Sequence, residues 1–289
     1  MLVVPHAAGT GVDAVARGFS PALQKIFETG VVVENRVGAN GAIGSVGVAK
    51  AKGDGSTLML NASPPFVTFP FTQATPSYDA VKDFKPVARV GTVPMVLVVS
   101  ADSGIKTFDQ FLAYVKANPG KANYASPGSG SAGYLAMERL KALKSVQVQE
   151  VLYKSTPQSL VDVSGGHVLS AFSSVPAVAA LVEAGKLRPL AIGSTRRMQQ
   201  FPDVPTLAEL TGDKQFLALV WYGFLAPAGT PPETVARLYG AISTAYGTEA
   251  VQQAMRSQGI LPELQAPAEF ERSLAAEYKA AATLLKPNP

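Results

Sequence analysis

Near its beginning the chain passes from an apolar run to a loop of small residues and then to a repeat of apolar positions. Val3 and Val4 form the run, and residues 5–11 include two alanines, two glycines and a threonine. Apolar residues then recur every three or four positions, at Val12, Val15, Ala16, Phe19, Leu23, Ile26 and Phe27. This spacing predicts a strand, a loop and an amphipathic helix. Because the first N–H groups of a helix have no internal acceptor, the loop also predicts an anion site.

The next segment continues the alternation of strands and helices. Apolar runs at 31–34 and 58–60 predict strands, and the small residues of 42–50 predict a helix between them. Strands that alternate with helices in this way favour a parallel sheet with right-handed crossovers. Ligands are expected beyond the carboxyl ends of such strands.

The middle of the chain repeats the opening pattern. Residues 93–99 give the strongest strand signal, and a helix is predicted from Thr107 to a stop at 118–120. A strand at 122–125, a loop at 126–131 and a helix from Ala132 then resemble the opening stretch. The remaining pattern predicts strands at 146–151, 168–172, 188–193 and 219–225, and helices after Pro157, from 173 to 185, from 230 to 242, from 248 to 259 and from 270 to 285.

This order of elements predicts an α/β fold with two lobes. Residues 1–97 and 221–289 are assigned to lobe 1, and residues 98–220 to lobe 2. Extended segments near 93–100 and 219–227 would join the lobes and act as a hinge, with ligand held in the cleft between them.

Composition excludes several classes of function. The 289 residues carry a net charge of +4, from 25 basic and 21 acidic side chains that form no block, so no nucleic-acid surface is predicted. The absence of cysteine removes disulfides and thiolate chemistry. No apolar run reaches the ~18 residues of a membrane span. Met1 stands directly on an apolar strand, so the sequence indicates either a cytosolic protein or one without its signal peptide.

The candidate catalytic residues form no recognisable constellation. His6 and His167 are the only histidines, and neither has the neighbours of a triad or a metal site. His6, in the first loop, is a candidate ligand contact. Ser126, Ser129 and Ser131 do not stand in a Gly-x-Ser-x-Gly elbow, and neither glycine loop completes a nucleotide motif. Helix capping and anion binding explain these serines more simply, so no catalytic residue, metal or cofactor is predicted.

Residues 61–83 form a long loop that is rich in proline and aromatic side chains. Its aromatics, Phe66, Phe69 and Phe71, argue against disorder. Packing of the loop onto its own lobe explains most of them. Phe66 follows the predicted strand most closely, so it alone is predicted to lie beside a ligand.

Six blocks of sequence resemble the Bug family, the solute-binding proteins of tripartite tricarboxylate transporters. The likeness runs in order over essentially the whole chain, and the second and last blocks are the most specific. The blocks are Pro-His-Ala-Ala-Gly-Thr-Gly-Val-Asp at 5–13, Val-Val-Glu-Asn-Arg-Val-Gly-Ala-Asn-Gly at 32–41, Asn-Pro-Gly-Lys-Ala-Asn-Tyr-Ala-Ser at 118–126, Val-Leu-Tyr-Lys-Ser at 151–155, Pro-Asp-Val-Pro-Thr at 202–206 and Trp-Tyr-Gly-Phe-Leu-Ala-Pro-Ala-Gly-Thr-Pro at 221–231.

The resemblance implies a fold, a ligand class and a set of contacts. The fold would be a two-lobed, type II-like periplasmic binding protein, with a mixed sheet flanked by helices in each lobe. The protein would be a periplasmic monomer without its signal peptide that delivers a small carboxylate to membrane permease subunits. Ligand contacts would come from Ala8, Gly9, Thr10, Gly11 and Asp13 in the first loop, from Ser126, Gly128, Ser129, Gly130 and Ser131 in the second, and from Ser63, Phe66 and Ser155.

Three positions depart from the pattern of that family. Members commonly carry Asp where this chain has Leu169 and Ser173, and Gly where it has Ser155. With Ser173 at a strand end that would face the cleft, a ligand amino group would lose a counter-ion. The ligand is therefore expected to be a plain mono- or dicarboxylate, aromatic ones included because of Phe66, and not an amino acid.

Two other functions remain open at this point. A receptor of the same kind could report the carboxylate to a signalling partner instead of a permease. A hydrolase or lyase could use the serines of 126–131.

Overall fold

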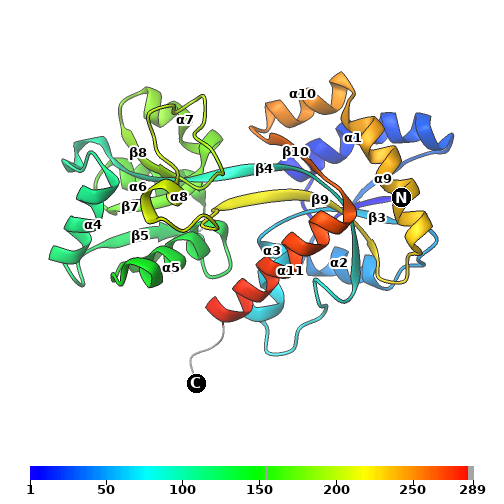
Figure 1. Ribbon diagram of the computed structural model, residues 1–289, viewed down its shortest axis with the longest axis horizontal. Helices are drawn as coiled ribbons and strands as arrows, with labels where there is room; N and C mark the ends of the chain where they lie inside the picture. The colour runs from blue at the N-terminus through cyan, green and yellow to red at the C-terminus, as the bar shows by residue number, and fades with distance from the viewer. Residues whose placement is uncertain (154, 286–289) are drawn as a thin grey trace. The chain divides into compact units, whose positions relative to one another are not determined.

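The computed structural model describes residues 1–153 and 155–285 (Figure 1), and the chain divides into two compact units. Unit 1 comprises Met1–Thr92 and Trp221–Pro289, and unit 2 comprises Val93–Val220. Both boundaries fall inside long strands, β4 (Phe84–Ser100) and β9 (Leu219–Pro227). The first boundary lies between Thr92 and Val93, whereas the sequence placed it between residues 97 and 98.

Unit 1 contains a mixed sheet whose first three strands are parallel. The strand β1 (Leu2–Val4) lies between β2 (Val33–Asn35) and β3 (Leu58–Ala62), and both pairings are parallel. β9 pairs with β3 in the antiparallel sense, β4 follows β9, and β10 (Leu261–Gln265) runs antiparallel to β4. The predicted parallel arrangement of the first three strands is confirmed.

The helices of unit 1 cover this sheet. They are α1 (Gly11–Phe27), α2 (Ala42–Ala49), α3 (Pro65–Thr68), α9 (Pro232–Tyr246), α10 (Glu249–Ser257) and α11 (Pro267–Leu284), with short 3-10 turns at Ala39–Gly41 and Phe69–Thr72. α1 packs against α9 and α10 (Figure 1). Its predicted apolar face is buried through Val12, Val15 and Phe19, and the ring of Phe19 meets Phe224 of β9 edge-on with centroids 5.0 Å apart.

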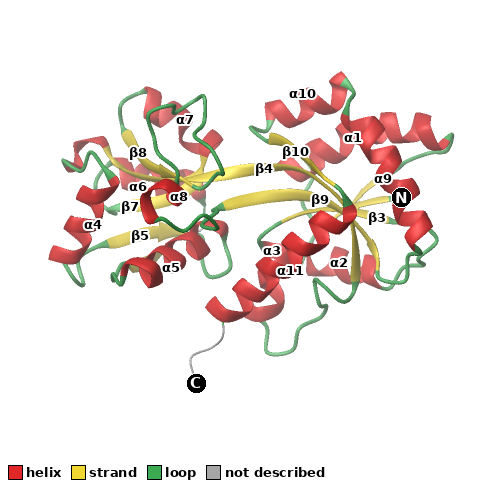
Figure 2. Cartoon of the chain, in the orientation of Figure 1, coloured by secondary structure: helices red, strands yellow, loops and turns green. Residues whose placement is uncertain are grey.

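Unit 2 is built on a second mixed sheet. β4 pairs antiparallel with β7 (Ser170–Ser174) and with β8 (Leu187–Ile192). β5 (Asn123–Ser126) runs parallel to β7 and to β6 (Gln149–Leu152). Figure 2 shows helices around these strands, namely α4 (Phe108–Ala117), α5 (Ala132–Lys144), α6 (Thr156–Ser164), α7 (Val175–Glu183) and α8 (Leu207–Thr211), with a 3-10 turn at Ala101–Ser103. One buried cluster, which includes Phe108, Tyr124, Met137 and Phe172, forms its core.

Several elements were not predicted from the sequence, among them the first half of β4, the strand β10 and the helices α3 and α8. The strand β4 already begins at Phe84. Its first half was not predicted, because Pro86, a buried Arg89 and Gly91 interrupt the apolar pattern. β10 pairs with that half, and its Glu263 accepts a hydrogen bond from Arg89 Nη2 at 3.2 Å. α8 has only five residues and begins with a capping box formed by Thr206 and Glu209. Among the described residues, no helix combines the length and apolarity needed to cross a membrane.

Candidate ligand site

In unit 1, the carboxyl ends of β1, β2 and β3 are tied together by polar side chains. His6, just after β1, forms a 2.8 Å hydrogen bond between its Nε2 and Asn61 Oδ1 of β3. Asn35 at the end of β2 donates from Nδ2 to the His6 carbonyl at 3.0 Å. Burial lowers the pKa of His6 and outweighs the opposing effect of the Asn61 hydrogen bond. His6 is therefore a neutral link between strands, and its Nε2 is already engaged.

Asp13 braces the first loop from inside. Its carboxylate is 3% exposed and accepts from Gly9 N at 2.9 Å, Arg17 Nε at 3.0 Å and Asn35 Nδ2 at 2.9 Å. Burial alone would raise the Asp13 pKa, but these three donors together lower it. Both carboxylate oxygens accept from protein donors in this arrangement, and the predicted direct contact between Asp13 and a ligand stays a prediction.

The rest of the first loop lies at the surface of unit 1. Ala8 and Gly9 are exposed, and Gly9 has a φ of +81°, which favours glycine at this turn. Thr10 precedes α1, but its side chain does not cap the helix and donates instead to the Ala7 carbonyl at 2.8 Å. The first-turn N–H groups of α1 are thus left without that cap, and such a helix end attracts an anion.

The sequence did not predict that two side chains, Tyr222 and Gln258, lie beside Gly11. A Cβ at Gly11 would lie 2.9 Å from the hydroxyl of Tyr222 and 3.4 Å from Gln258 Oε1. Tyr222 belongs to β9, which pairs with β3, and Gln258 ends α10. Tyr222 belongs to the sequence block at 221–231, but only the pairing of distant strands brings it to the start of α1.

Ser63 and Phe66 lie in the interior of unit 1, and their predicted contacts with a ligand stay predictions that this burial does not favour. The Ser63 hydroxyl accepts from Trp221 N at 3.1 Å, and both residues are 1% exposed. The Phe66 ring is stacked on Tyr78 and meets Trp221 edge-on, at centroid distances of 5.5 and 6.2 Å. Phe66 is also 1% exposed, so packing onto its own unit explains it, as for the other aromatics of the loop.

In unit 2, serine hydroxyls fold the second loop around positive-φ glycines. Ser126 Oγ accepts from Gly128 N at 2.9 Å, and Gly128 O accepts from Ser131 N at 3.2 Å. Gly128 and Gly130 have φ values of +112° and +89°. Ser131 begins α5 and accepts from Tyr134 N at 3.2 Å, so it acts as the predicted cap. Ser129 is exposed at the tip.

An apolar side chain that was not predicted borders the second loop. Leu152, the last residue of β6, is 70% exposed, and a Cβ at Gly128 would lie 3.7 Å from its Cδ2. Because β5 and β6 are parallel, their carboxyl ends share one edge of the sheet, which brings Leu152 beside the loop after β5. This contact gives the loop one apolar wall.

Ser155 and Ser173 differ sharply in exposure. Ser155 precedes α6, is exposed and makes no side-chain cap. Ser173 lies near the end of β7 and is 5% exposed, and its Oγ has no hydrogen-bond partner among the described residues. Phe172 points into the core of unit 2, so the alternation along the strand turns Ser173 towards the face on which α6 and α7 pack. An unpaired buried hydroxyl is costly, which marks Ser173 as a position with a specific role.

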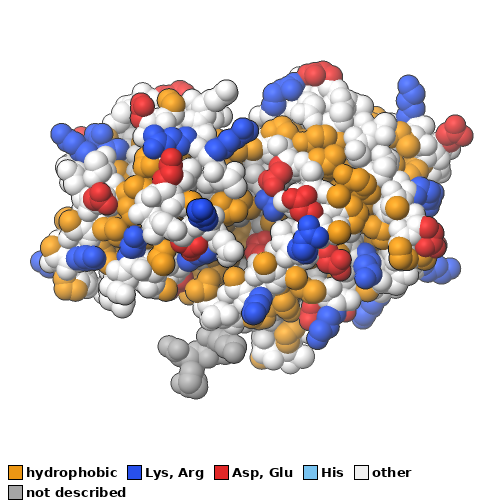
Figure 3. Space-filling model, viewed as in Figure 1, with side chains coloured by type: hydrophobic (Ala, Val, Ile, Leu, Met, Phe, Trp, Pro, Cys, Tyr) orange, Lys and Arg blue, Asp and Glu red, His pale blue; other side chains and the backbone are white. Residues whose placement is uncertain are grey.

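Neither loop carries a metal-type cluster or a basic group. No group of three His, Cys, Asp or Glu side chains that could hold a metal occurs in the described part of the chain. Figure 3 shows basic and acidic side chains interspersed over the visible face, without a large patch of one sign. What the loops offer an anion is therefore backbone N–H groups, hydroxyls and helix dipoles.

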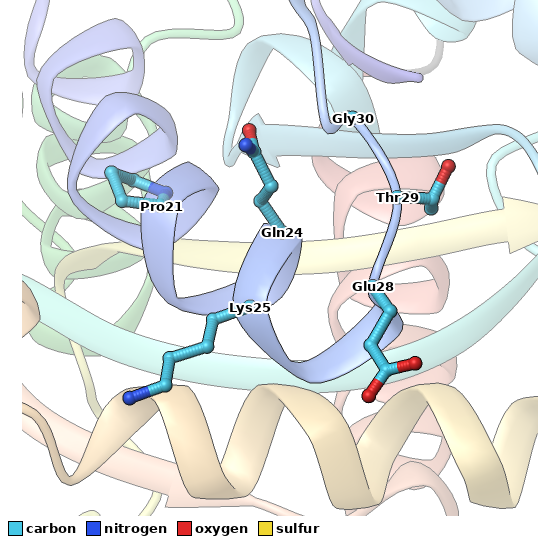
Figure 4. Close-up of a pocket in the computed structure, with 6 residues that line it drawn as sticks. All are labelled: Pro21, Gln24, Lys25, Glu28, Thr29 and Gly30. Carbon is cyan, nitrogen blue, oxygen red and sulfur yellow. The ribbon is translucent and has the colours of Figure 1, made fainter.

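A hollow at the opposite end of α1 does not belong to this arrangement. Figure 4 shows its lining, which consists of Pro21, Gln24, Lys25, Glu28, Thr29 and Gly30. None of the predicted contact residues lines it, and its Lys25 and Glu28 have opposite charges.

The comparison with protein families decides the identity of the chain. The family model described as "Tripartite tricarboxylate transporter family receptor" matches residues 15–286. The chain belongs to this family of transporter receptors. The resemblance to Bug proteins is thereby confirmed, and BugT of Bordetella pertussis is 35% identical over 280 residues, which cover 96% of this receptor and 85% of BugT.

Solved structures extend the likeness to the fold. A TctC solute-binding protein from Polaromonas, solved without ligand, superposes with a TM-score of 0.87 at 28% identity, over 98% of this receptor and 96% of that chain. An R. palustris protein solved with adipate gives 0.76 at 29% identity, over 98% and 96%. MatC from Rhodopseudomonas palustris with bound malate gives 0.76 at 28% identity, over 99% and 98%. The predicted class, an α/β periplasmic binding protein, is confirmed.

Proposed function

We propose that this receptor captures a small carboxylate in the periplasm and delivers it to the permease subunits of its transporter. The proposal rests on the paired loops at 6–11 and 126–131, each of which follows a parallel strand and begins a helix. We further propose that each of these two loops contributes contacts to the carboxylate. Relatives solved with adipate and with malate support this ligand class.

Neutral donors are sufficient for such a ligand. A helix N-terminus stabilises a partly buried carboxylate by up to ~2 kcal/mol, and each charge-assisted hydrogen bond contributes roughly 1.5–3 kcal/mol. Two such loops can therefore support roughly micromolar binding without an arginine or a lysine. The exposed Ala8, Gly9 and Ser129 are the residues that would meet the ligand first.

The ligand proposed here is a plain aliphatic mono- or dicarboxylate. Ser173 offers a neutral hydroxyl and no counter-ion for an amino group, which disfavours amino acids. Phe66 is buried among other rings and does not favour an aromatic ligand. Leu152 beside Gly128 provides an apolar wall for a methylene chain instead.

Thermal-shift and calorimetric measurements with adipate, malate, aspartate and glutamate test this proposal. A bound carboxylate at one hundred times its Kd should raise the free energy of unfolding by about 2.7 kcal/mol. Adipate or malate should bind and remain unchanged in the mixture. Tight binding of aspartate or glutamate, with none for adipate or malate, would contradict the proposed ligand class.

A variant of the first loop tests the role of the loops themselves. Gly9→Leu adds a side chain where the loop is open and φ is +81°. It should weaken every carboxylate alike, because the loops grip the shared carboxylate group. A change in preference among ligands, without a general loss of affinity, would mean that the first loop sets specificity.

No observation favours a serine hydrolase. The hydrogen bonds of the Ser126 and Ser131 side chains go to backbone groups of Gly128 and Tyr134. A nucleophilic serine requires a neighbouring base, and these contacts supply none. Turnover of a carboxylate ester by the purified receptor would reverse this conclusion.

A further inference from the structure

A carboxyl group on the last long helix bonds to a strand of unit 1 and takes no part in the proposed ligand contacts. Glu277 lies on α11 and is partly buried. Glu277 Oε2 accepts a 2.5 Å hydrogen bond from Trp221 Nε1.

Ser63 and Trp221 are themselves joined by two further hydrogen bonds. Ser63 N donates to the Trp221 carbonyl, and Trp221 N donates to Ser63 Oγ, both at 3.1 Å. Ser63 directly follows β3, and Trp221 is the first residue of unit 1 on β9. Through its bond to Trp221, Glu277 therefore supports the point where the end of β3 meets β9.

This support reaches the first ligand loop through β9. Trp221 faces Glu277 and Phe270, while the next residue, Tyr222, points to the other face of the strand, where its hydroxyl lies against Gly11. A displacement of Trp221 must therefore move the group that packs on the start of α1.

The charges around Glu277 leave its carboxylate poorly compensated. Among the described residues, Arg89 of β4 is the one charged side chain that favours the ionised form of Glu277, but Arg89 Nη2 is paired with Glu263 of β10. Burial dominates and raises the pKa of Glu277 to about 7, although the Trp221 hydrogen bond, Arg89 and Ser63 oppose it.

The other elements packed on α11 add no compensating charge. α3, at Pro65–Thr68, has no titratable side chain. On α9, Arg237 lies 6.0 Å over the ring of Phe27. On α11 itself, burial first and then the charge of Asp79 raise the pKa of Tyr278 to about 12.

We propose that Glu277 is a positioning residue for the first ligand loop, acting through Trp221 and Tyr222, and that its protonation couples carboxylate capture to pH. This inference rests on the proposed function. An anionic ligand at the start of α1 disfavours a second negative charge in the same unit. Binding should therefore draw a proton onto Glu277, and the carboxylate should bind more tightly as pH falls through neutrality.

The intrinsic fluorescence of the receptor reports on this group without any ligand. Trp221 is the only tryptophan of the chain, and its indole N–H contacts Glu277 directly. Its emission should titrate with a midpoint near 7 in the unchanged receptor. Glu277→Gln should abolish that transition, whereas Glu271→Gln, an exposed position on the same helix, should retain it. A transition that persists in Glu277→Gln, or none in the unchanged receptor, would overturn the inference.

Calorimetry with adipate then tests the coupling. Adipate should bind on the order of three- to tenfold more tightly at about pH 6 than at about pH 8, with proton uptake, and Glu277→Gln should flatten this dependence while still binding. Equal affinities at the two pH values in a receptor that binds adipate would refute the coupling alone. If no carboxylate of the panel binds while the Trp221 fluorescence still changes with pH, the proposed function fails. The contact of Glu277 with Trp221 then still holds as a pH-dependent support of β9.

Discussion

At the scale of single residues, Asp13 is a charged side chain of the first candidate loop whose carboxylate bonds to groups of the protein itself. Three donors from three different parts of unit 1 converge on it: Gly9, Arg17 and Asn35. The negative charge is therefore neutralised where an anionic ligand would approach. The loop keeps its shape without turning its own carboxylate towards a like charge.

Asp13→Ala should destabilise the receptor because it leaves these donors without an acceptor. We expect the free energy of unfolding in urea to fall by about 2–4 kcal/mol. Since the donors lower the Asp13 pKa, its contribution is present above the ordinary value of 3.8 and is lost as pH falls below it. Asp109→Ala, an exposed Asp in the first turn of α4, is the control and should change little. Equal losses in the two variants would contradict the bracing role.

At the scale of elements, the two units differ in how the helix after each candidate loop begins. α5 is capped by Ser131, whereas α1 has no side-chain cap from Thr10. α4, which follows no ligand loop, is capped by Thr107 with the same 3.2 Å bond to the third residue of the helix. Capping and ligand binding can therefore be separated by comparing α5 with α4.

Ser131→Ala and Thr107→Ala should each cost about 1 kcal/mol of stability through the lost cap. Only Ser131→Ala should also weaken carboxylate binding, because Ser131 is a predicted ligand contact whereas Thr107 is not. Urea unfolding and calorimetry on both variants measure the two effects. Equal binding by the two variants would remove Ser131 from the site.

The last long helix, α11, should carry a measurable pH dependence of stability. The unfolded chain releases the Glu277 proton near 4.5, and the folded receptor releases it near 7, so the folded state holds an extra proton between these values. The free energy of unfolding should therefore fall as pH rises through this window, by up to about 3 kcal/mol. Comparison of urea midpoints for the unchanged receptor and Glu277→Gln isolates this contribution. A variant with the same slope would rule it out.

Local patterns were enough for most of the elements and for the two loops. The helix over 12–27 and the cap at Ser131 depend on nearby residues, so the sequence predicts them. The roles of Asp13, Ser63 and Phe66 depend on Arg17, Trp221 and Tyr78, and such contacts have no local signal. The contact between Tyr222 and Gly11 and the approach of Leu152 to Gly128 were missed for the same reason. The remaining predicted contacts with ligand stay predictions.

At the scale of the whole molecule, the sequence of unit 2 is inserted between the two sequence segments of unit 1. Unit 2 is one continuous segment, Val93–Val220, and has its own buried core. Unit 1 consists of two segments that must meet. We therefore expect only unit 2 to fold independently of the rest of the chain.

A fragment of residues 93–220 should fold by itself. It retains β4 from Val93 onwards, together with β7 and β8, which pair with that part of the strand. We expect cooperative thermal unfolding by circular dichroism, as is usual for a domain of this size. A broad, non-cooperative transition would show that the fragment depends on unit 1.

The same insertion has a consequence for the order of folding. The bond between Trp221 N and Ser63 Oγ joins residues 158 positions apart, and β3 meets its partner β9 only after all of unit 2 has been synthesised. Closing so long a loop is slow compared with forming the nearby contacts of unit 2. Until β9 has been synthesised, the edge of β3 that pairs with it has no partner. An unpaired strand edge can pair with another chain. The interval before β9 arrives is therefore the stage at which this receptor is most exposed to aggregation.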